Sequence, residues 1–432
     1  MSPIQEKQFN LSTISKKFTE ETLRLILNKA LGRDDCLLDR WIIVGDACNK
    51  GDGYLSEVVR MKVYAKCPVS KVEEQHSVDL IIKSLPSNIG RRKSFRSTDF
   101  FRNEIAFYEH VLPAFEKLQK RNQVNYNLFP RCYAWFCDGE EDFLALEDLS
   151  PDGYASPVRQ EGLNNLQCRL VMLTLAQFHA LSYALKDQDL GVYQNITGKL
   201  EETYFDEKFR VWVQDFHKDQ RACMLDAMEK ELPNTIYQEK IYEFTNEHFF
   251  ANMIKMATTK GQYSVINHGD SWTPNFLIKY ASENLQKDVP KHVKLIDFQL
   301  VRDASPILDL MFFFYSGTTE DLRKYHFKDL IQYYYDSLCY SIKELGADPE
   351  KMYPKNAFHD ELKIYSKFGL GFSLESVPFT LMKNDDAPDL DMIESDDAVP
   401  ITTVWKVRPI AHKEGRLRLV DNVRHAVDNG YL

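Results

Sequence analysis

Two short polar segments carry most of the residues that could do chemistry. The first, His268-Gly269-Asp270, is followed five residues later by Asn275, and the second places Asp297 directly after an apolar stretch. Phosphoryl transfer from a nucleotide needs a carboxylate to orient the acceptor hydroxyl and oxygen ligands to hold Mg²⁺ on the phosphates. These side chains would supply those groups, so the sequence predicts phosphoryl transfer with ATP and Mg²⁺ as cofactors.

Each of these three residues has a role in that interpretation and a simpler alternative. Asp270 follows an apolar run and a glycine, so it would project from a loop as the catalytic base; the alternative is a solvated loop aspartate. Asn275 would bind the metal through its amide oxygen, or it is a turn residue beside Pro274. Asp297 ends a buried strand, where a carboxylate is costly unless it is paired or bound to a metal. We therefore predict Asn275 and Asp297 as the metal ligands.

A lysine and a glutamate form the predicted cationic part of the site. Lys83 closes the apolar strand that begins at Val78, and Glu104 lies within the apolar stripe of a predicted helix over residues 100–112. A carboxylate in an apolar stripe favours pairing with a buried cation, and Lys83 would then contact the nucleotide phosphates. The alternative is a lysine at the rim and a helix glutamate that never meet.

Two further segments could contact the nucleotide. Gly51 and Gly53 lie in a loop between predicted strands, where their backbone could approach phosphates, although an ordinary hairpin explains them equally well. Glu147 and Leu149 fall where a hinge between lobes is expected, and their backbone could pair with an adenine base.

Three polar residues near the motifs are interpreted as structural. His179 lies in a mostly apolar helix and is predicted to be a hydrogen-bonded core residue, and His268 is predicted to brace the loop. Asp309 precedes an apolar run and is predicted to brace the catalytic loop or to cap a helix. The basic run 91–93 and the acidic run 385–397 are interpreted as solvated loops.

Composition excludes several functional classes. The net charge of -10 argues against nucleic acid as a partner, because phosphate contacts need clustered Lys and Arg, and it argues against anionic membranes as well. The apolar run 307–315 is too short to span a bilayer, and the first ten residues lack the apolar core of a signal peptide. Eight scattered cysteines without metal or redox spacing predict reduced thiols in a cytoplasmic protein.

The elements that must position these residues fall into two regions. The first is a small lobe over residues 20–147, expected to bind nucleotide and to hold a mostly antiparallel sheet. Its predicted helices span residues 20–31 and 100–112, and its predicted strands span residues 41–44, 54–64, 77–85 and 143–146. Residues 148–432 turn mainly helical and would form the catalytic and acceptor-binding lobe. The fold class predicted is therefore α+β and bilobal, with nucleotide in the crevice between lobes.

The acceptor is predicted to be a small molecule and not a protein. Protein kinases share the Asp, Asn and Asp order, but His268 is followed here by Gly269 where they have Arg. Eleven residues separate Asp297 from Asp309, and an apolar helix is predicted to follow at once. An extended segment for docking a peptide does not fit in that space.

These motifs carry a family resemblance. His268-Gly269-Asp270 with Asn275, then Asp297 and Asp309, resemble the aminoglycoside phosphotransferase and choline kinase group of protein-kinase-like folds. With the segments Leu146 to Leu149 and Ile296 to Gln299, the chain more specifically resembles the ecdysteroid kinase-like family over nearly its whole length.

The resemblance implies an ATP- and Mg²⁺-dependent kinase that phosphorylates a hydroxyl of an ecdysteroid or another lipophilic steroid-like compound. Asp270 would be the base, and Lys83, held by Glu104, the phosphate lysine. One alternative is a different acceptor, such as another small metabolite, a xenobiotic or an aminoglycoside-like compound. Two others are a non-catalytic pseudokinase and a lipophile carrier. A monomer and a weak dimer are both left open. The candidate lining residues of an apolar acceptor site are Trp272, Phe372, Phe379 and Trp405.

Overall fold

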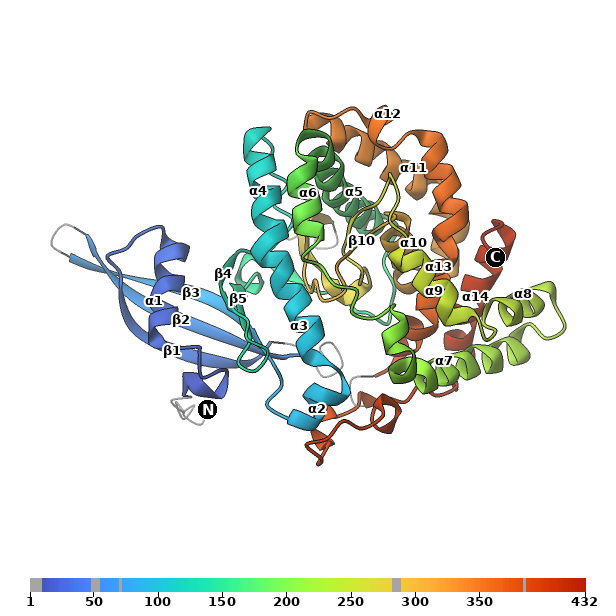
Figure 1. Cartoon of the computed structure of the whole chain (residues 1–432), viewed down its shortest axis with the longest axis horizontal. Helices are drawn as coiled ribbons and strands as arrows, with labels where there is room; N and C mark the ends of the chain where they lie inside the picture. Colours follow the sequence, from blue (N-terminus) through green and yellow to red (C-terminus); the bar gives the residue numbers. More distant parts are fainter. Residues whose placement is uncertain (1–9, 48–54, 70–71, 282–288, 384–385) are drawn as a thin grey trace. The chain divides into compact units, whose positions relative to one another are not determined.

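The chain divides into two compact units, each described here by itself. The computed structural model describes residues 10–47, 55–69, 72–281, 289–383 and 386–432, and every structural statement refers to these (Figure 1). Unit 1 comprises Met1–Ile105, Pro130–Gly153 and Asn384–Val399. Unit 2 comprises Ala106–Phe129, Tyr154–Lys383 and Pro400–Leu432.

Unit 1 is built on a five-stranded antiparallel sheet in the order β1-β2-β3-β5-β4. The strands are β1 (Leu37–Asp46), β2 (Glu57–Val69), β3 (Val72–Ser84), β4 (Cys132–Phe136) and β5 (Phe143–Glu147). Helix α1 (Glu20–Leu31) buries Leu23, Ile26 and Leu27 in one core with alternate residues of β2 and β3. The predicted helix over residues 20–31 is therefore confirmed, as is the antiparallel sheet.

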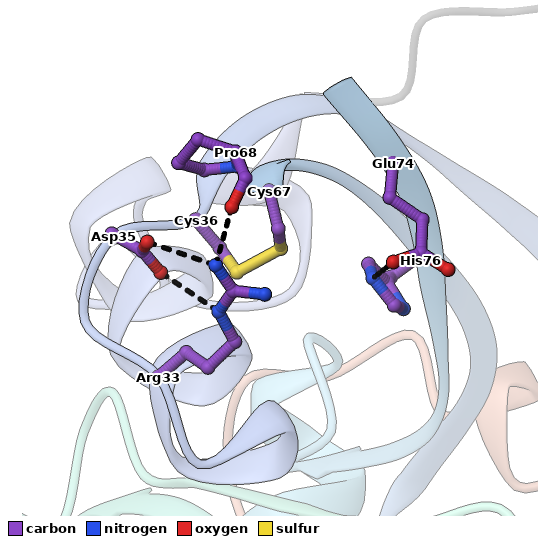
Figure 2. Close-up of a disulfide and its surroundings, with 7 residues drawn as sticks. All are labelled: Arg33, Asp35, Cys36, Cys67, Pro68, Glu74 and His76. Carbon is purple, nitrogen blue, oxygen red and sulfur yellow. Dashed lines mark hydrogen bonds and ion pairs between the residues drawn. A yellow bond between two sulfur atoms is a disulfide. The ribbon is translucent and has the colours of Figure 1, made fainter. Parts of the chain in front are cut away.

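A disulfide joins the first two strands of this sheet. Cys36 directly precedes β1 and Cys67 lies in β2, and their Cα atoms are 4.3 Å apart (Figure 2). The prediction that the thiols are reduced is therefore wrong for this pair. Antiparallel pairing explains why: Leu37 is aligned with Lys66, so the next two residues outward face each other across the strands. Beside the disulfide, the guanidinium of Arg33 donates to the carbonyl oxygen of Pro68, at 2.7 Å.

The C-terminal part of unit 1 packs on a short helix, α2 (Ile89–Ser94), which precedes α3 (Ser97–Ala106). Arg91 is 7% exposed and its Nη1 lies 3.1 Å from Oδ1 of Asp391. The Asn88 amide donates to the carbonyl oxygens of Asp391 and Ile393. The interpretation of residues 91–93 as a solvated loop is therefore wrong, because all three residues lie in α2 and Arg91 is buried. The described acidic residues after 385 include one, Asp391, that pairs with Arg91.

Unit 2 is mainly helical. Its helices are α4 (Leu112–Arg121), α5 (Asn165–Gln188), α6 (Leu190–Thr197), α7 (Arg210–Glu231), α8 (Ile236–Phe244), α9 (Phe249–Thr258), α10 (Ile307–Gly317), α11 (Glu320–Glu344), α12 (Pro349–Met352), α13 (Lys355–Leu381) and α14 (Lys413–Asp428). The predicted helix over residues 100–112 is split into α3, a π-helical turn over Phe107–Val111 and the start of α4.

The core of unit 2 is formed by long apolar helices. Helix α5 packs along α11, and α10 packs along α13 (Figure 1). In α13, Gly369 lies against the backbone of Met311 and Phe312, where a Cβ atom would overlap those atoms, so glycine permits this close crossing. By length and composition α5 could cross a membrane, but 78% of its apolar window is buried inside the protein, as in a core helix.

Two small antiparallel sheets of unit 2 carry the motif loops. One pairs β7 (Val265–Asn267) with β10 (Arg302–Ala304). The other has the order β6-β8-β9, with β6 (Tyr154–Ala155), β8 (Phe276–Tyr280) and β9 (Pro290–Leu295). Strand β7 directly precedes His268-Gly269-Asp270, and β9 ends two residues before Asp297.

Candidate active site

The loop that carries Asp270 leaves β7 through a glycine. Gly269 has a φ of 82°, and a Cβ atom at this position would overlap the carbonyl oxygen of Leu300. Only glycine combines that dihedral angle with so close an approach of two backbone segments. The segment after β7 therefore turns sharply, and the half-buried Asp270 side chain follows at the end of the strand.

Asp309 holds this loop in place, as predicted. Its carboxylate, 1% exposed at the start of α10, accepts hydrogen bonds from the backbone N–H groups of His268 (2.6 Å) and Gly269 (2.8 Å). It also lies 3.1 Å from Nε2 of His179, whose Nδ1 lies 2.7 Å from the Tyr334 hydroxyl. His179 is therefore a buried structural residue, and the prediction for it is confirmed.

His268 braces the loop from the other side. Its Nε2 atom lies 2.9 Å from the Ile296 carbonyl oxygen, and its Nδ1 accepts the backbone N–H of Asp270 at 3.3 Å. A ring that accepts at Nδ1 and donates at Nε2 is the neutral imidazole. Desolvation lowers the pKa of His268, which favours the same neutral form.

A hairpin brings the two predicted metal ligands side by side. Strands β8 and β9 pair with Phe276 opposite Leu295, so Asn275 falls opposite Ile296. The Ile296 N–H donates to the Asn275 carbonyl oxygen at 3.2 Å, which extends the pairing by one step. Asp297 is the next residue along, and its φ of 69° ends the strand there. The register of one hairpin therefore brings Asn275 next to Asp297.

Asn275 also joins this pair to Asp270. Its Nδ2 atom donates to the backbone carbonyl oxygen and to Oδ2 of Asp270, both at 3.0 Å. The amide nitrogen is thereby turned toward Asp270, which leaves the amide oxygen as the part of the side chain that could bind a cation. Within unit 2 the structure brings together Asp270, Asn275 and Asp297, as the sequence predicts.

Electrostatics mark Asp270 as the most perturbed carboxylate of this cluster. Desolvation, the charge of Asp297 and then the charge of Glu375 raise its pKa well above the ordinary value, whereas the Asn275 amide and the Arg302 guanidinium act to lower it. Strongly perturbed carboxyl groups concentrate at functional sites. Glu375 and Arg302 are thus part of the electrostatic environment of Asp270, and neither was predicted from the sequence.

Arg302 is positioned by its own partners. Its Nε donates to Oε2 of Glu202 at 2.7 Å, and its guanidinium lies over the ring of Phe205, 5.3 Å from the centroid. The side chain is 4% exposed. Its position in β10 could have indicated that Arg302 lies near the motif loop, because Arg302 is aligned with Asn267, the residue before His268.

In unit 1, the predicted pair of Lys83 and Glu104 is present. Lys83 Nζ lies 2.6 Å from Glu104 Oε2, with the two residues 7% and 0% exposed. Lys83 is aligned with Val58 on β2 and Leu144 on β5, so it lies on the central strand of the sheet. A buried charged pair of this kind holds an ammonium group in one defined place.

The predicted hinge already uses two of its backbone donors within unit 1. The N–H of Glu147 donates to the Arg131 carbonyl oxygen at 2.9 Å, and that of Asp148 donates to the Asp79 carbonyl oxygen at 3.1 Å. An adenine base bound at this segment would therefore have to pair with the N–H group of Leu149 or with backbone carbonyl oxygens, because the other two N–H groups are already used. Gly51 and Gly53 lie outside the described residues.

Two of the four predicted lining residues belong to the aromatic core of unit 2. Phe372 is 5% exposed and stacks on Phe312, with centroids 4.2 Å apart. Phe379 is 3% exposed and packs edge-on against Trp405 at 4.9 Å. Trp272 and Trp405 remain half-buried. An acceptor lined by these rings stays a prediction.

The sheet with its buried Lys–Glu pair and the helical unit with its Asp–Asn–Asp cluster define an α+β protein of the bilobal, protein-kinase-like class. The sequence match is more specific, since the ecdysteroid kinase-like family matches residues 50–347, more than half of the chain. The chain belongs to that family. A search of curated proteins finds no match.

Two solved structures are similar to the chain over most of its length. One is the ethanolamine kinase of Plasmodium vivax, with 11% identity over 96% of this chain and 91% of that chain and a TM-score of 0.40. The other is the GDP complex of an aminoglycoside phosphotransferase, with 12% identity over 82% of this chain and 89% of that chain and a TM-score of 0.35. Because both TM-scores are low, family membership rests on the sequence match alone.

Proposed function

We propose that the protein is an ATP- and Mg²⁺-dependent kinase that phosphorylates a hydroxyl group of a small molecule, an ecdysteroid or another lipophilic steroid-like compound. One observation carries the proposal: the hairpin of β8 and β9 brings Asn275 next to Asp297, while the same Asn275 amide holds the Asp270 carboxylate. A base and two oxygen ligands for a cation are thereby grouped in one half-buried place.

The donor set of this cluster suits magnesium. Mg²⁺ prefers hard oxygen ligands and is usually held by one or two carboxylates together with substrate phosphates. Asp297 would supply a carboxylate and Asn275 its amide oxygen, which is turned away from Asp270 because the nitrogen faces that carboxylate. When bound there, the ion would neutralise charge on the phosphate oxygens of ATP.

Asp270 would act on the acceptor. Its carboxylate accepts the proton of the acceptor hydroxyl while that oxygen forms a bond to the γ-phosphorus and the bond from phosphorus to the bridging oxygen breaks, releasing ADP. Asp309 keeps the loop in register for this step, because it holds the N–H groups of His268 and Gly269.

Lys83, held by Glu104, would contact the α- and β-phosphates, with the Gly51 and Gly53 loop and the Glu147 to Leu149 hinge completing nucleotide binding. The proposal keeps a nucleotide-binding lobe over residues 20–147 and a catalytic lobe over residues 148–432. The compact units differ from this division, because residues 106–129 belong to unit 2 and residues 148–153 and 384–399 to unit 1. The cytoplasmic location stays a prediction.

The segment after Asp297 supports a small acceptor. The eleven residues before Asp309 contain strand β10 and the first two residues of α10, Ile307 and Leu308. Regular structure thus occupies the stretch in which a protein kinase would carry an extended segment for its peptide substrate. A small hydroxylated metabolite or xenobiotic outside the steroid class fits this observation equally well.

The test is phosphoryl transfer by purified protein with MgATP and a panel of hydroxylated steroids and plant metabolites, with products identified by mass spectrometry. Asp270→Asn is expected to lower turnover by about 10²–10⁴-fold while nucleotide binding is retained. Asp303→Asn is the matched control, because Asp303 is a half-buried carboxylate on β10 that accepts the Tyr193 hydroxyl at 2.7 Å. Equal turnover in the two variants would remove Asp270 from the proposed role.

A non-catalytic nucleotide-binding pseudokinase is the second candidate, and the panel separates it from the kinase. A pseudokinase would melt at a higher temperature with MgATP, since ligand at a hundred times its dissociation constant adds about 2.7 kcal/mol, yet yield no phosphorylated product. A lipophile carrier would bind steroid with no effect of ATP. Asp297→Asn is expected to abolish the Mg²⁺-dependent part of the nucleotide effect.

A further inference from the structure

A segment near the C-terminus belongs to unit 1, although the chain on either side of it belongs to unit 2. We call its described residues, 386–399, the C-terminal strap. Three apolar side chains of the strap are each at most 7% exposed, and these are Ala387, Leu390 and Ile393. The strap is therefore packed against unit 1 and does not extend into solvent.

Contacts from along the strap converge on the short helix α2. The Val399 N–H donates to the Ser94 hydroxyl at 2.9 Å, and the amide nitrogen of Asn88, the N-cap of α2, donates to two strap carbonyl oxygens at 3.1 and 3.0 Å. Between these contacts, a Cβ atom on Gly90 would overlap the Ser395 carbonyl oxygen. Any other residue at position 90 would therefore push the two backbones apart.

Arg91 connects the strap to the residues that follow the predicted phosphate loop. Its Nη1 lies 3.1 Å from Oδ1 of Asp391, and its Nη2 donates to the Ser56 carbonyl oxygen at 3.3 Å. Ser56 directly precedes β2 and follows Gly51 and Gly53 in the sequence. One buried guanidinium thereby holds both a strap carboxylate and the backbone just after that loop, as its fixed planar array of donors allows.

Helix α2 also lies between the two partners of the buried ion pair. Lys83 precedes it near the end of β3 and Glu104 follows it in α3, so the chain that connects the pair passes through α2. The start of this connection is fixed to β2, because the N–H and the hydroxyl of Ser87 donate to Oε1 of Glu57 at 2.6 and 2.7 Å. A shift of α2 would therefore be transmitted to Glu104 and to the Lys83 ammonium that it holds.

We propose that the C-terminal strap is a positioning element for the nucleotide. By holding α2, it keeps Ser56 and the Lys83–Glu104 pair in the arrangement that receives the phosphates of ATP. The inference rests on the proposed function and adds to its nucleotide site a segment from beyond α13. Gly90 and Asp391 are then positioning residues, because both act through α2. Loss of their contacts weakens ATP binding and leaves the acceptor site unaffected, because all of these contacts lie within unit 1.

The test compares Asp391→Ala with Asp396→Ala, a matched pair within the strap. Both carboxylates are exposed, and Asp391 is the one that pairs with Arg91. Gly90→Ala is a second probe, because alanine favours the helix but places a methyl group on the Ser395 carbonyl oxygen. Asp391→Glu keeps the charge and is the conservative variant. Binding of MgATP to each purified protein is measured by calorimetric titration, which needs no acceptor.

Asp391→Ala is expected to weaken MgATP binding by about three- to fivefold, the upper end of what a half-exposed ion pair contributes. Gly90→Ala should weaken it by about tenfold or more, because small displacements of positioning groups are costly. Asp396→Ala stays within about twofold of the wild-type protein, and Asp391→Glu recovers most of the affinity. In turnover with an acceptor from the panel, the KM for ATP rises in the first two variants while the KM for the acceptor is unchanged.

Amide hydrogen exchange of the nucleotide-free protein gives a readout that does not depend on ATP. Exchange over residues 56–60 and over α3 should be faster in Asp391→Ala and Gly90→Ala than in Asp396→Ala, because the strap no longer holds α2. The exchange of α5, in unit 2, should be the same in all of the variants.

The inference is overturned if Asp391→Ala and Gly90→Ala bind MgATP as tightly as Asp396→Ala does. A parallel rise in the KM for ATP and for the acceptor also overturns it, because the strap would then stabilise the whole fold and not the nucleotide site. If the wild-type protein binds no MgATP, faster exchange in α3 of the two variants supports positioning of the Lys83–Glu104 pair by the strap and refutes the proposed kinase activity. Unchanged exchange in that case overturns both.

Discussion

Replacing Glu375 by glutamine should change how the stability of the protein depends on pH. The ordinary pKa of a glutamate is 4.5, and desolvation raises that of Glu375 to about 7 in the folded state. Between these values the folded protein holds a proton that the unfolded chain has released, so stability falls as the pH rises. Glutamine does not ionise, and the variant is spared that loss.

The magnitude follows from the two pKa values. Raising the pH from 5 to 8 costs the wild-type protein about 2 kcal/mol through this one group, since each pKa unit corresponds to about 1.4 kcal/mol. The hydrogen bonds that the Tyr204 hydroxyl and the Gln220 amide donate to Glu375 change strength in the variant, but that change is nearly the same at both pH values and cancels in the comparison. Relief of Asp270 from a neighbouring charge acts in the same direction.

The assay is urea unfolding at pH 5 and pH 8, followed by tryptophan fluorescence. Three of the five tryptophans, Trp212, Trp272 and Trp405, lie in unit 2 with Glu375. Glu229→Gln, at an exposed position of α7, controls for the removal of one negative charge. The quantity compared is the change in unfolding free energy between pH 5 and pH 8, relative to the wild-type protein. If this change is the same for Glu375→Gln and Glu229→Gln, the Glu375 carboxyl group is not desolvated as described and the reasoning fails.

Three further predictions concern contacts within the two units. Lys83→Met leaves the buried Glu104 carboxylate without its ammonium and should lower stability by about 3–5 kcal/mol; denaturation should show partial recovery when Glu104→Leu is added. Asp309→Asn should cost about 2–3 kcal/mol at pH 7, because the charge that accepts two backbone N–H groups is lost. Burial alone would raise the pKa of Asp309, but the hydrogen bond and charge of His179 outweigh burial, so the pKa is lowered. The stability that this carboxylate contributes is therefore complete above pH 3.8 and is lost as the pH falls through the pKa of the folded state. A destabilisation by Asp309→Asn that does not become smaller in melts at acid pH would contradict the role. Replacing both Cys36 and Cys67 by serine should cost about 4 kcal/mol for a loop of 31 residues; reductant should destabilise the wild-type protein equally and leave the double variant unchanged.

The part of the site that the sequence could predict is the part built from local geometry. Asp270 and Asn275 lie in one loop, and a single hairpin aligns Asn275 with the residue before Asp297. The spacing of the three residues in the sequence is therefore enough to predict that they lie close together. Lys83 and Glu104 were also predictable, because a charged side chain within an apolar helix stripe must find a partner.

What the sequence did not reveal depends on long-range packing. The bond between Tyr204 and Glu375 spans 171 residues, so nothing in the sequence of α13 identifies the partner of this glutamate. The disulfide was not predicted because the register of β1 and β2, and not a cysteine motif, brings Cys36 and Cys67 together. The acidic run was interpreted as solvent-facing because Arg91, its partner, precedes it by 300 residues.

The return of Asn384–Val399 to unit 1 has a consequence for biosynthesis. A ribosome makes the strands of unit 1 early, but the residues that pair with Arg91 and Asn88 emerge only when almost the whole polypeptide has been translated. Helix α2 must therefore wait with an uncovered face while more than two hundred later residues are added. Premature termination shortly before residue 384 would leave that face bare, and such products would be natural clients of chaperones and proteases.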